Sequence, residues 1–292
     1  MELRSNGVLI TGGSGFLGRA LAKRILDNNP GQRVCIYSRG EHQQAAMFKA
    51  LGEHPNLRMF IGDVRDASRL RWAMESVDVV IHAAALKRIE VGHYNPAEMV
   101  KTNVLGAMNV VEAAISAGVS RVVLSSTDKA YQPVSPYGIS KAMAEAVFLA
   151  ANNTRGPAGP EFCVCRYGNV AGSTGSVIER WWDAKRAGVT RVQVTDPDCT
   201  RFWMTIDEAV DLVLAAANGA GTLLIPTLPA FTVGNLATAM GLEMELVGLP
   251  AWEKKHETLA PGITSDTARR MTVAELEQAL MTVGRNPPMV VP

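Results

Sequence analysis

The sequence predicts an α/β protein with a doubly wound parallel sheet and a small C-terminal lobe. Short strand-like apolar runs alternate with helical segments through the first part of the chain, and a glycine-rich turn joins the first strand to the first helix. Repeated strand–helix units favour right-handed crossovers with helices on both faces of one sheet. We expect the sheet domain to span residues 1–167, with 205–225 returning to it, and the lobe to comprise 168–204 and 226–292.

Length and composition exclude several classes of function. The 292 residues, 47% hydrophobic and 20% charged, are typical of a globular protein with a sizeable core. A formal net charge of +1 gives no electrostatic reason to expect nucleic acid or a membrane surface as a partner. The first strand begins almost at once, without a signal-like segment or a long apolar run, so we expect a cytoplasmic protein.

The four cysteines, Cys35, Cys163, Cys165 and Cys199, lack metal-ligand spacing, so we expect reduced thiols and no metal site. Cys163 and Cys165 alternate along a predicted strand and therefore point to the same face.

The first strand, Gly7 to Thr11, leads through a glycine-rich turn into a helix. Glycines at this turn permit close approach of the backbone to a pyrophosphate, and the helix N-terminus supplies N–H donors and a positive dipole. In this strand-to-helix context the spacing is typical of a dinucleotide-binding Rossmann domain. The expected cofactor contacts here are Gly12, Ser14, Gly15, Phe16, Leu17 and Gly18.

The second strand, Arg33 to Tyr37, ends in Ser38 and Arg39, where a site that prefers NAD usually carries an acidic residue. A hydroxyl and a guanidinium suit the 2′-phosphate of NADP instead. The sequence therefore predicts NADP as cofactor, with a solvated surface arginine as the alternative.

The third and fourth strands, Leu57 to Ile61 and Val77 to His82, end in further candidate cofactor contacts. Asp63 can accept a hydrogen bond from the adenine amino group while Val64 packs on the ring, although Asp63 as a helix cap is an alternative. Small residues after the fourth strand let the backbone approach the cofactor, whereas His82 itself is interpreted as a packed strand residue. The expected contacts in this region are Ala83, Ala84, Ala85, Lys87 and, near the start of the next long helix, Asn103.

The remaining expected elements follow from hydrophobic periodicity and capping signals. Helices are expected at 41–51, 67–75, 96–118, 137–151, 177–187 and 206–217, strands at 121–124, 162–166 and 191–194, and a last helix with Thr272 and Glu275 at capping-box spacing.

Tyr137 and Lys141 are four residues apart on a predicted helix and therefore share a face. A neighbouring cation favours phenolate and lowers the pKa of a tyrosine, which would make Tyr137 an acid/base for an alcohol. The alternative is an ordinary amphipathic pair. Thr127, Asp128 and Lys129 strengthen the catalytic interpretation, because they put an acid and a base at the carboxyl end of a strand, where open α/β sheets bind ligands.

Ten motifs taken together are specific to one group of enzymes. They are Thr11-Gly-Gly-Ser-Gly-Phe-Leu-Gly18, Tyr37-Ser-Arg39, His82-Ala-Ala-Ala-Leu-Lys87, Asn95-Pro96, Lys101-Thr-Asn103, Ser126-Thr-Asp-Lys-Ala130, Tyr137-Gly-x-x-Lys141, Arg166-Tyr-Gly-Asn-Val170, Gly172-Ser-x-Gly-Ser-Val177 and Thr200-Arg-Phe-Trp203. With them the chain resembles the extended short-chain dehydrogenase/reductases, and among these the UDP-N-acetylglucosamine 4,6-dehydratases that invert carbon 5, a family of polysaccharide biosynthesis proteins. The segment Trp252-Glu-Lys-Lys-His-Glu257 departs from that family's Gly-Glu-Lys-Leu-His-Glu, and the C-terminal lobe is short.

The resemblance implies an NADP-dependent lyase that converts UDP-N-acetylglucosamine to a UDP-4-keto-6-deoxy-L-hexose. Tyr137, assisted by Lys141, would take the proton of the carbon-4 hydroxyl, and Thr127 would stabilise the enolate. Lys129 would act as base at carbon 5, which requires a neutral amine, so burial or nearby cations are expected to lower its pKa. Asp128 would act as acid for the carbon-6 hydroxyl. The implied substrate contacts are Lys87, Asn169, Ser176, Val177, Arg201, His256 and Glu257.

Two alternatives remain open from the sequence. A 4-epimerase would leave Asp128 and Lys129 without a role, and retaining dehydratases of the superfamily carry Asp-Glu at that place. A non-catalytic NADP-binding regulator would not need Tyr137 and Lys141. Small residues on the helices at 96–118 and 137–151, among them Gly106 and Ala107, permit a helical interface, so we expect a homo-oligomer.

Overall fold

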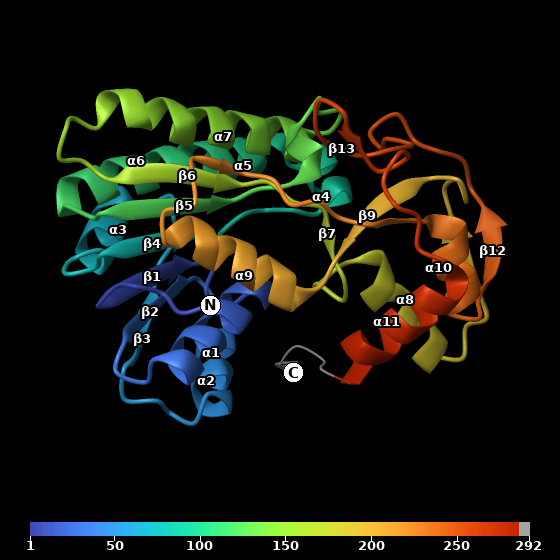
Figure 1. Cartoon of the computed structure of the whole chain (residues 1–292), viewed down its shortest axis with the longest axis horizontal. Helices are drawn as coiled ribbons and strands as arrows, with labels where there is room; N and C mark the ends of the chain where they lie inside the picture. The colour runs from blue at the N-terminus through green and yellow to red at the C-terminus, as the bar shows by residue number, and fades with distance from the viewer. Residues whose placement is uncertain (286–292) are drawn as a thin grey trace.

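The computed structural model describes residues 1–285 and has a seven-stranded parallel sheet at its centre (Figure 1). The strands run in the spatial order β10 (Leu223–Leu224), β6 (Glu161–Cys165), β5 (Arg121–Ser125), β4 (Val79–His82), β1 (Gly7–Thr11), β2 (Arg33–Ser38) and β3 (Leu57–Ile61). The chain order reverses beside β1, which places a crevice at the carboxyl ends of the strands. The predicted doubly wound parallel sheet is confirmed.

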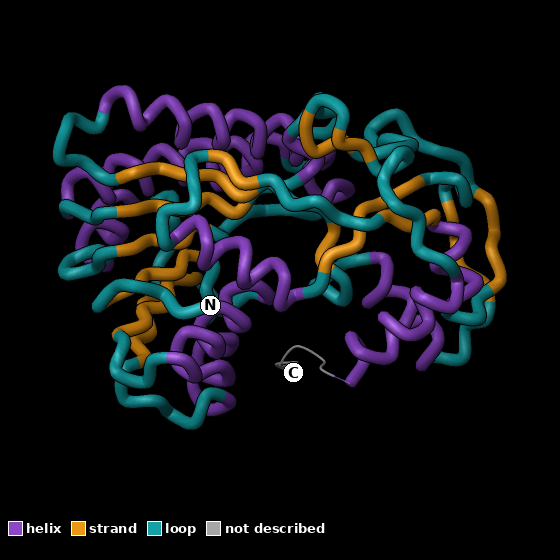
Figure 2. Tube along the Cα trace, in the orientation of Figure 1, coloured by secondary structure: helices purple, strands orange, loops and turns teal. Residues whose placement is uncertain are grey.

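Helices cover both faces of this sheet (Figures 1 and 2). One face carries α1 (Phe16–Asn28), α2 (Glu41–Ala50) and α9 (Ile206–Ala217), and the other carries α3 (Ala67–Ala73), α6 (Gly106–Ala117) and α7 (Pro136–Thr154). Because successive strand residues point to opposite faces, Val8 and Ile10 of β1 enter the first core and Leu9 enters the second. Cys163 and Cys165 of β6 share the first core, as their alternation predicts.

The helix predicted over 96–118 is interrupted in the structure. A short helix, α4 (Ile89–Tyr94), precedes α5 (Pro96–Met99), and a π-helical segment, η1 (Val100–Leu105), joins α5 to α6. Asn103 within η1 explains the local distortion, because its side chain bonds both the N–H (2.8 Å) and the C=O (2.9 Å) of Leu86 after β4.

The C-terminal lobe is built from short strands and three helices. Its elements are β7 (Asn169–Val170), α8 (Val177–Arg186), β8 (Arg191–Val194), β9 (Thr200–Met204), β11 (Ala230–Thr232), α10 (Val233–Ala239), β12 (Glu243–Leu246), β13 (Thr258–Ala260), β14 (Ile263–Thr264) and α11 (Val273–Arg285). A separate apolar core containing Trp181, Trp203 and Phe231 holds it together. The predicted capping box is confirmed, since the hydroxyl of Thr272 accepts from the N–H of Glu275 at 3.2 Å and the Glu275 carboxylate accepts from the N–H of Thr272 at 2.8 Å.

Residues 286–292, the end of the predicted lobe, lie outside the described residues. Over residues 1–285, no helix combines the length and the apolar character needed to cross a membrane.

Candidate active site

A cavity of about 1300 Å³ lies between the carboxyl ends of the sheet strands and the C-terminal lobe. Nearly all the predicted cofactor residues line it, and they come from the turns after β1, β2, β3 and β4 and from α7. These residues are Gly12, Ser14, Gly15, Phe16, Leu17, Gly18, Ser38, Arg39, Asp63, Val64, Ala83, Ala84, Ala85, Lys87, Tyr137 and Lys141. In the described part of the chain, no group of three His, Cys, Asp or Glu side chains could hold a metal ion.

The glycine-rich turn fits closely against the segment after β4. Gly12 has a φ of +66°, and a Cβ atom there would lie 2.7 Å from the backbone nitrogen of Ala84. A side chain at position 12 would therefore be both strained and in collision. The floor of the cavity at this end is backbone, which suits a pyrophosphate bound by N–H groups.

The turn after β2 presents a cation and a hydroxyl to the cavity. The Arg39 side chain is 59% exposed and its Nη1 lies 3.9 Å from Oδ2 of Asp63, while the Ser38 hydroxyl accepts from Nε2 of Gln44 at 2.9 Å. Although partial burial would raise the pKa of Asp63, hydrogen bonds from Arg65 hold that pKa below its ordinary value. The alternative of Asp63 as a helix cap is wrong, because Asp66 caps α3 by accepting from the N–H of Arg69.

Asn103 does not line the cavity. It is buried, and its Nδ2 also donates to the hydroxyl of Ser140 at 2.9 Å. Ser140 in turn donates to the C=O of Tyr137 at 2.8 Å. In the protein alone, Asn103 therefore connects the segment after β4 with the start of α7.

Of the predicted reactive residues, Thr127, Lys129, Tyr137 and Lys141 line the cavity, whereas Asp128 is fully buried beside them and does not line it. Thr127, Asp128 and Lys129 follow β5 in a short 3-10 turn, η2 (Asp128–Ala130), and Tyr137 stands at the start of α7. The two segments touch at Gly138, where a Cβ atom would lie 2.3 Å from the carbonyl oxygen of Lys129. Glycine at 138 thus permits the contact between η2 and α7.

Lys141 and Tyr137 do not form the electrostatic pair that the sequence predicts. Burial raises the pKa of Tyr137 to about 12, opposed by the charge of Lys129 and a hydrogen bond with Thr127 rather than by Lys141. Nζ of Lys141 donates to the C=O of Ser125 at 2.7 Å, and burial lowers its pKa to about 8. The expectation that Lys141 lowers the pKa of Tyr137 is wrong for the protein without cofactor, because that hydrogen bond directs the amine toward β5.

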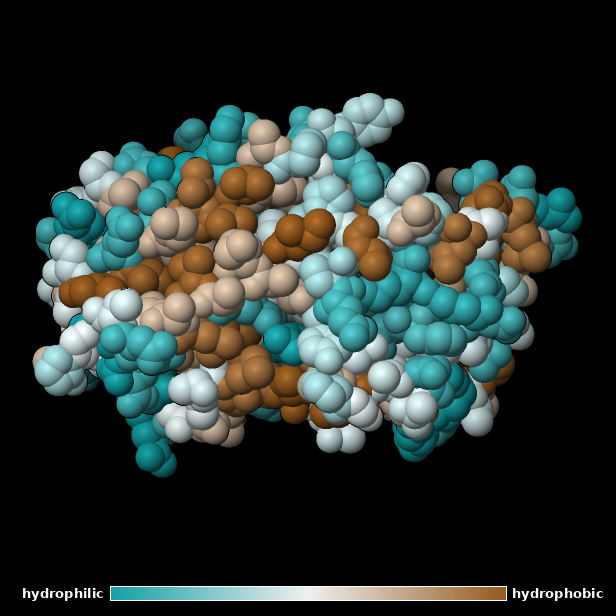
Figure 3. All heavy atoms as spheres, turned by 90° about the horizontal axis from the view of Figure 1, so that it is seen from above, coloured by the Kyte–Doolittle hydropathy of each residue, from teal (hydrophilic) through white to brown (hydrophobic). Residues whose placement is uncertain are grey.

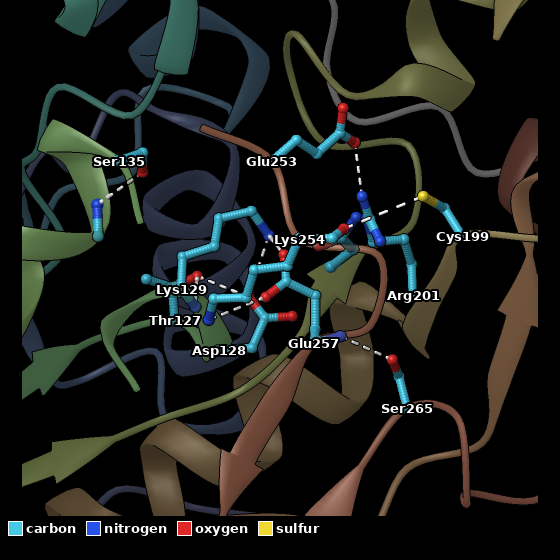
Figure 4. Close-up of polar contacts among 12 residues, drawn as sticks. Thr127, Asp128, Lys129, Ser135, Cys199, Arg201, Glu253, Lys254, Glu257 and Ser265 are labelled. Carbon is cyan, nitrogen blue, oxygen red and sulfur yellow. Dashed lines mark hydrogen bonds and ion pairs between the residues drawn. The ribbon is translucent and has the colours of Figure 1, made fainter. Parts of the chain in front are cut away.

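The surroundings of Lys129 favour the opposite protonation state from the one that its predicted role requires. Its Nζ lies 3.1 Å from Oδ1 of Asp128 and 3.2 Å from Oε1 of Glu257 (Figure 4). It also lies 3.2 Å from Oδ1 of Asn169. Burial alone would lower the pKa of Lys129, but the carboxylates of Asp128 and Glu257 outweigh burial and raise it above the ordinary value. The direction of this shift favours the ammonium, so the expectation that the surroundings lower the pKa of Lys129 is wrong.

Asp128 has the surroundings of a carboxylic acid. The side chain is fully buried, its Oδ1 accepts from the Thr127 hydroxyl at 2.9 Å, and its Oδ2 has no hydrogen-bond partner among the described residues. Burial raises the pKa of Asp128, with Lys129 acting in the opposite direction. This is the direction that a proton donor requires.

The predicted substrate residues divide into two groups. Lys87, Asn169, Ser176, Val177, Arg201 and Glu257 line the cavity. His256 lies outside it, with its Nδ1 2.9 Å from the hydroxyl of Thr200, because alternation along the chain turns it away from its neighbour Glu257.

Sequence reasoning missed Arg88, Trp252, Glu253 and Lys254, which also line the cavity. Lys254 contacts the residue that follows η2, since its Nζ donates to the C=O of Tyr131 at 2.7 Å. The signal was present in the spacing, because Lys254 lies three positions before Glu257, which was a candidate. Burial of both side chains could not be read from the sequence.

The chain is similar to several known proteins. The family model described as "Polysaccharide biosynthesis protein" matches residues 8–277. A UDP-N-acetylglucosamine 4,6-dehydratase (inverting) of Campylobacter jejuni is 41% identical over 263 residues, covering 89% of this chain and 78% of the relative. A UDP-glucose 4-epimerase of Rickettsia conorii is 39% identical over 263 residues, covering 86% of this chain and 76% of the relative.

Solved structures share the fold. Pen from Bacillus thuringiensis superposes with a TM-score of 0.90 at 29% identity, covering 97% of this chain and 100% of that chain. A dTDP-glucose 4,6-dehydratase from Streptomyces venezuelae, with NAD bound, superposes with a TM-score of 0.81 at 22% identity, covering 96% and 97%. At that identity the likeness shows the fold alone.

Proposed function

The chain belongs to the polysaccharide biosynthesis protein family, and we propose from this membership and the site geometry that it is a nucleotide-sugar 4,6-dehydratase. We further propose UDP-N-acetylglucosamine as substrate, NADP as cofactor and inversion at carbon 5. The product is a UDP-4-keto-6-deoxy-L-hexose, and the enzyme is a lyase because the cofactor is regenerated in each turnover.

One observation carries this proposal. An amine and a phenol, contributed by Lys129 and Tyr137, line the same cavity as the glycine-rich turn, and an acid, the buried Asp128, lies next to the amine with its Oδ1 3.1 Å from Nζ. Proton transfers at three neighbouring carbons need three such groups within reach of one sugar. The relative from Campylobacter jejuni with the same printed activity supports the assignment.

A nicotinamide cofactor bound against the glycine-rich turn would accept hydride from carbon 4 and return it to carbon 6. Tyr137 takes the proton from the carbon-4 hydroxyl. Its pKa of about 12 in the protein alone is too high for this role, so the reaction requires a stronger cationic influence on the phenol when the site is filled. We assign this cationic effect on the phenol to Lys141, which is buried on the same helix face as Tyr137.

The second stage uses the Asp128–Lys129 pair. Transfer of one proton from Nζ of Lys129 to Oδ1 of Asp128, over 3.1 Å, gives a neutral amine and a carboxylic acid. The amine then takes the proton from carbon 5, the acid gives its proton to the departing carbon-6 hydroxyl, and water leaves. Thr127 donates a hydrogen bond to the carbon-4 oxygen as negative charge develops there.

The preference for NADP rests on Ser38 and Arg39, which line the cavity at the end of β2. A guanidinium and a hydroxyl are suited to a phosphate monoester. The substrate contacts we propose are Lys87, Asn169, Ser176, Val177, Arg201 and Glu257.

A 4-epimerase is the second candidate, favoured by the 39% identity to an enzyme of that name. Epimerisation needs no acid or base at carbons 5 and 6, so it assigns no chemical role to Asp128 and Lys129. Incubating the purified protein with UDP-N-acetylglucosamine and measuring product mass separates the candidates. Loss of one water supports dehydration, while an unchanged mass with a new sugar isomer would reject it.

The stereochemistry is tested separately in deuterated water. Inversion predicts solvent deuterium at carbon 5 and an L-configured product. A D-configured product, trapped before it can re-epimerise, would overturn inversion even if dehydration occurs.

We also propose a homo-oligomer. Apolar side chains are exposed along η1, α6 and α7, and Figure 3, which looks down on the α7 side, shows hydrophobic residues concentrated over the sheet domain. They include Leu105, Met108, Ile115, Ile139 and Met143. The small residues from which the sequence predicted this interface, such as Gly106 and Ala107, instead face the sheet, where α6 packs closely.

A further inference from the structure

The ammonium of Lys129 is enclosed by three oxygen atoms from three different segments. Asp128 of η2, Asn169 of β7 and Glu257 just before β13 each place one oxygen 3.1–3.2 Å from Nζ. An ammonium has three N–H donors, so these oxygens match all of them. The side chain is therefore held in a defined position by both the sheet domain and the C-terminal lobe.

Glu257 is the carboxylate of this set whose pKa is held below its ordinary value. Asn169 is neutral, and burial raises the pKa of Asp128. Burial would also raise the pKa of Glu257, but Lys129, Arg201 and Lys254 together hold it below the ordinary value. Its Oε2 is buried 3.4 Å from Nζ of Lys254.

The C-terminal lobe fixes the position of Glu257. The backbone N–H of Glu257 donates to the Ser265 hydroxyl at 2.9 Å, and its C=O accepts from the N–H of Ser265 at 2.8 Å. Two contacts then join this segment to η2 and the residue after it. Glu257 contacts Lys129, and Lys254 donates to the C=O of Tyr131. Figure 4 shows Lys254 and Glu257 meeting Asp128 and Lys129.

We propose that Glu257 is a positioning residue that reaches from the C-terminal lobe to hold the Lys129 ammonium in place, and so sets the pH range in which Lys129 acts as a base. The inference rests on the proposed function, because it concerns the base of that reaction. A carboxylate in contact with an ammonium favours the charged form by one pKa unit or more. The other charged or titratable groups that face Lys129 are Asp128 of η2, Tyr137 of α7 and Arg201 of β9.

The test compares the wild type with Glu257→Gln by following the Lys129 side-chain signal in 13C-lysine-labelled protein as a function of pH, without substrate. The signal is assigned by its loss in Lys129→Arg. We expect the midpoint of Lys129 to fall by at least about one pH unit in Glu257→Gln, a roughly tenfold gain in neutral amine at a given pH. The proposal is overturned if Lys129 titrates with the same midpoint in both proteins. It is also overturned if both proteins keep the Lys129 ammonium over the whole pH range measured.

Two further variants make this test specific. Glu253→Gln makes the same chemical change four residues away, in a carboxylate that pairs with Arg201, and is expected to leave the Lys129 midpoint unchanged. Glu257→Asp keeps the charge but withdraws it by one methylene, so its midpoint is expected between those of wild type and Glu257→Gln. This variant decides the question if the glutamine variant does not fold, and a midpoint equal to that of the wild type then overturns the proposal.

A kinetic measurement connects the titration to catalysis. The rising limb of the pH profile for water loss is expected to move to lower pH in Glu257→Gln, whereas formation of reduced cofactor keeps its profile. A merely structural role would lower the rate without moving the limb. If the wild-type protein removes no water from the sugar, the proposed function fails, while the substrate-free titration still decides whether Glu257 controls the charge of Lys129.

Discussion

Among individual side chains, Tyr137 is the group on which the proposed oxidation depends. Tyr137→Phe removes the hydroxyl that exchanges a proton at carbon 4, and general acid–base groups contribute roughly 10²–10⁴-fold to rate. We expect a loss of that order in reduced-cofactor formation, measured by absorbance in a single turnover, with cofactor binding retained. Tyr131→Phe is the matched control, because Tyr131 lies outside the cavity lining and stacks against Arg166. Near-normal turnover in Tyr137→Phe would show that its hydroxyl is structural.

Lys129 separates the two stages of the reaction. Lys129→Ala removes the base at carbon 5 but leaves Tyr137 and Lys141, so we expect carbon-4 oxidation to proceed and elimination to stop. Reduced cofactor and a 4-keto, 6-hydroxy sugar should accumulate, which absorbance and mass spectrometry detect. Lys23→Ala, at an exposed lysine paired with Asp27 on α1, is the control. Normal water loss in Lys129→Ala would show that another residue is the base at carbon 5.

Asp128→Asn is expected to stop the reaction at the same stage, before water is lost.

Arg39 decides the choice of cofactor. Arg39→Ala should weaken binding of NADP(H) far more than that of NAD(H), because only NADP(H) carries the extra phosphate. Titration calorimetry with both cofactors measures this. Arg65→Ala removes the other guanidinium that pairs with Asp63 and lies outside the cavity lining, so it should affect the two cofactors alike. Equal losses for both cofactors in Arg39→Ala contradict the NADP assignment.

Among the structural elements, the contact between η2 and the start of α7 positions the reactive groups. A Cβ atom at position 138 would lie 2.3 Å from the Lys129 carbonyl oxygen, which is backbone and cannot turn aside. We expect Gly138→Ala to lower the free energy of unfolding by about 1–3 kcal/mol, as overpacking does, and to reduce activity further by separating Tyr137 from Lys129. Urea unfolding and turnover measure the two effects.

Gly31→Ala is the control for Gly138→Ala, because a Cβ atom at position 31 would meet only an ordinary contact at 3.5 Å. Unchanged stability and activity in Gly138→Ala would mean that α7 can shift without affecting the site.

The elements that local pattern determines were predicted well, and those that depend on distant contacts were not. Strands such as Gly7 to Thr11 could be predicted from their run of apolar residues, which arises because both faces of a parallel sheet are buried. The π-helical segment η1 was missed, since it depends on hydrogen bonds between Asn103 and the distant Leu86. The parallel pairing of β8 with β12 was also missed, because each strand is short and its partner lies far along the chain.

In the candidate site, too, the features set by local sequence could be predicted and those set by distant contacts could not. Chain order and strand ends sufficed to predict that Asp128, Lys129 and Tyr137 meet, because the carboxyl ends of parallel strands share one edge. The raised pKa of Lys129 could be predicted only in part, since Asp128 is its neighbour in the sequence but Glu257 arrives from the C-terminal lobe. Burial and counter-charges of this kind are properties of the folded chain.

For the molecule as a whole, the exposed apolar side chains on α6 and α7 predict self-association. Met143 is 52% exposed on α7, and a charged side chain there would be left without water in a packed interface. We expect Met143→Lys to shift the protein toward the monomer, measured as molar mass by light scattering during size-exclusion chromatography. Met281→Lys makes the same change at a methionine that is 63% exposed on α11, away from these helices, and should keep the wild-type mass. A wild-type protein that is monomeric at micromolar concentration would reject the homo-oligomer, and an oligomer that Met143→Lys leaves intact would move its interface to another face.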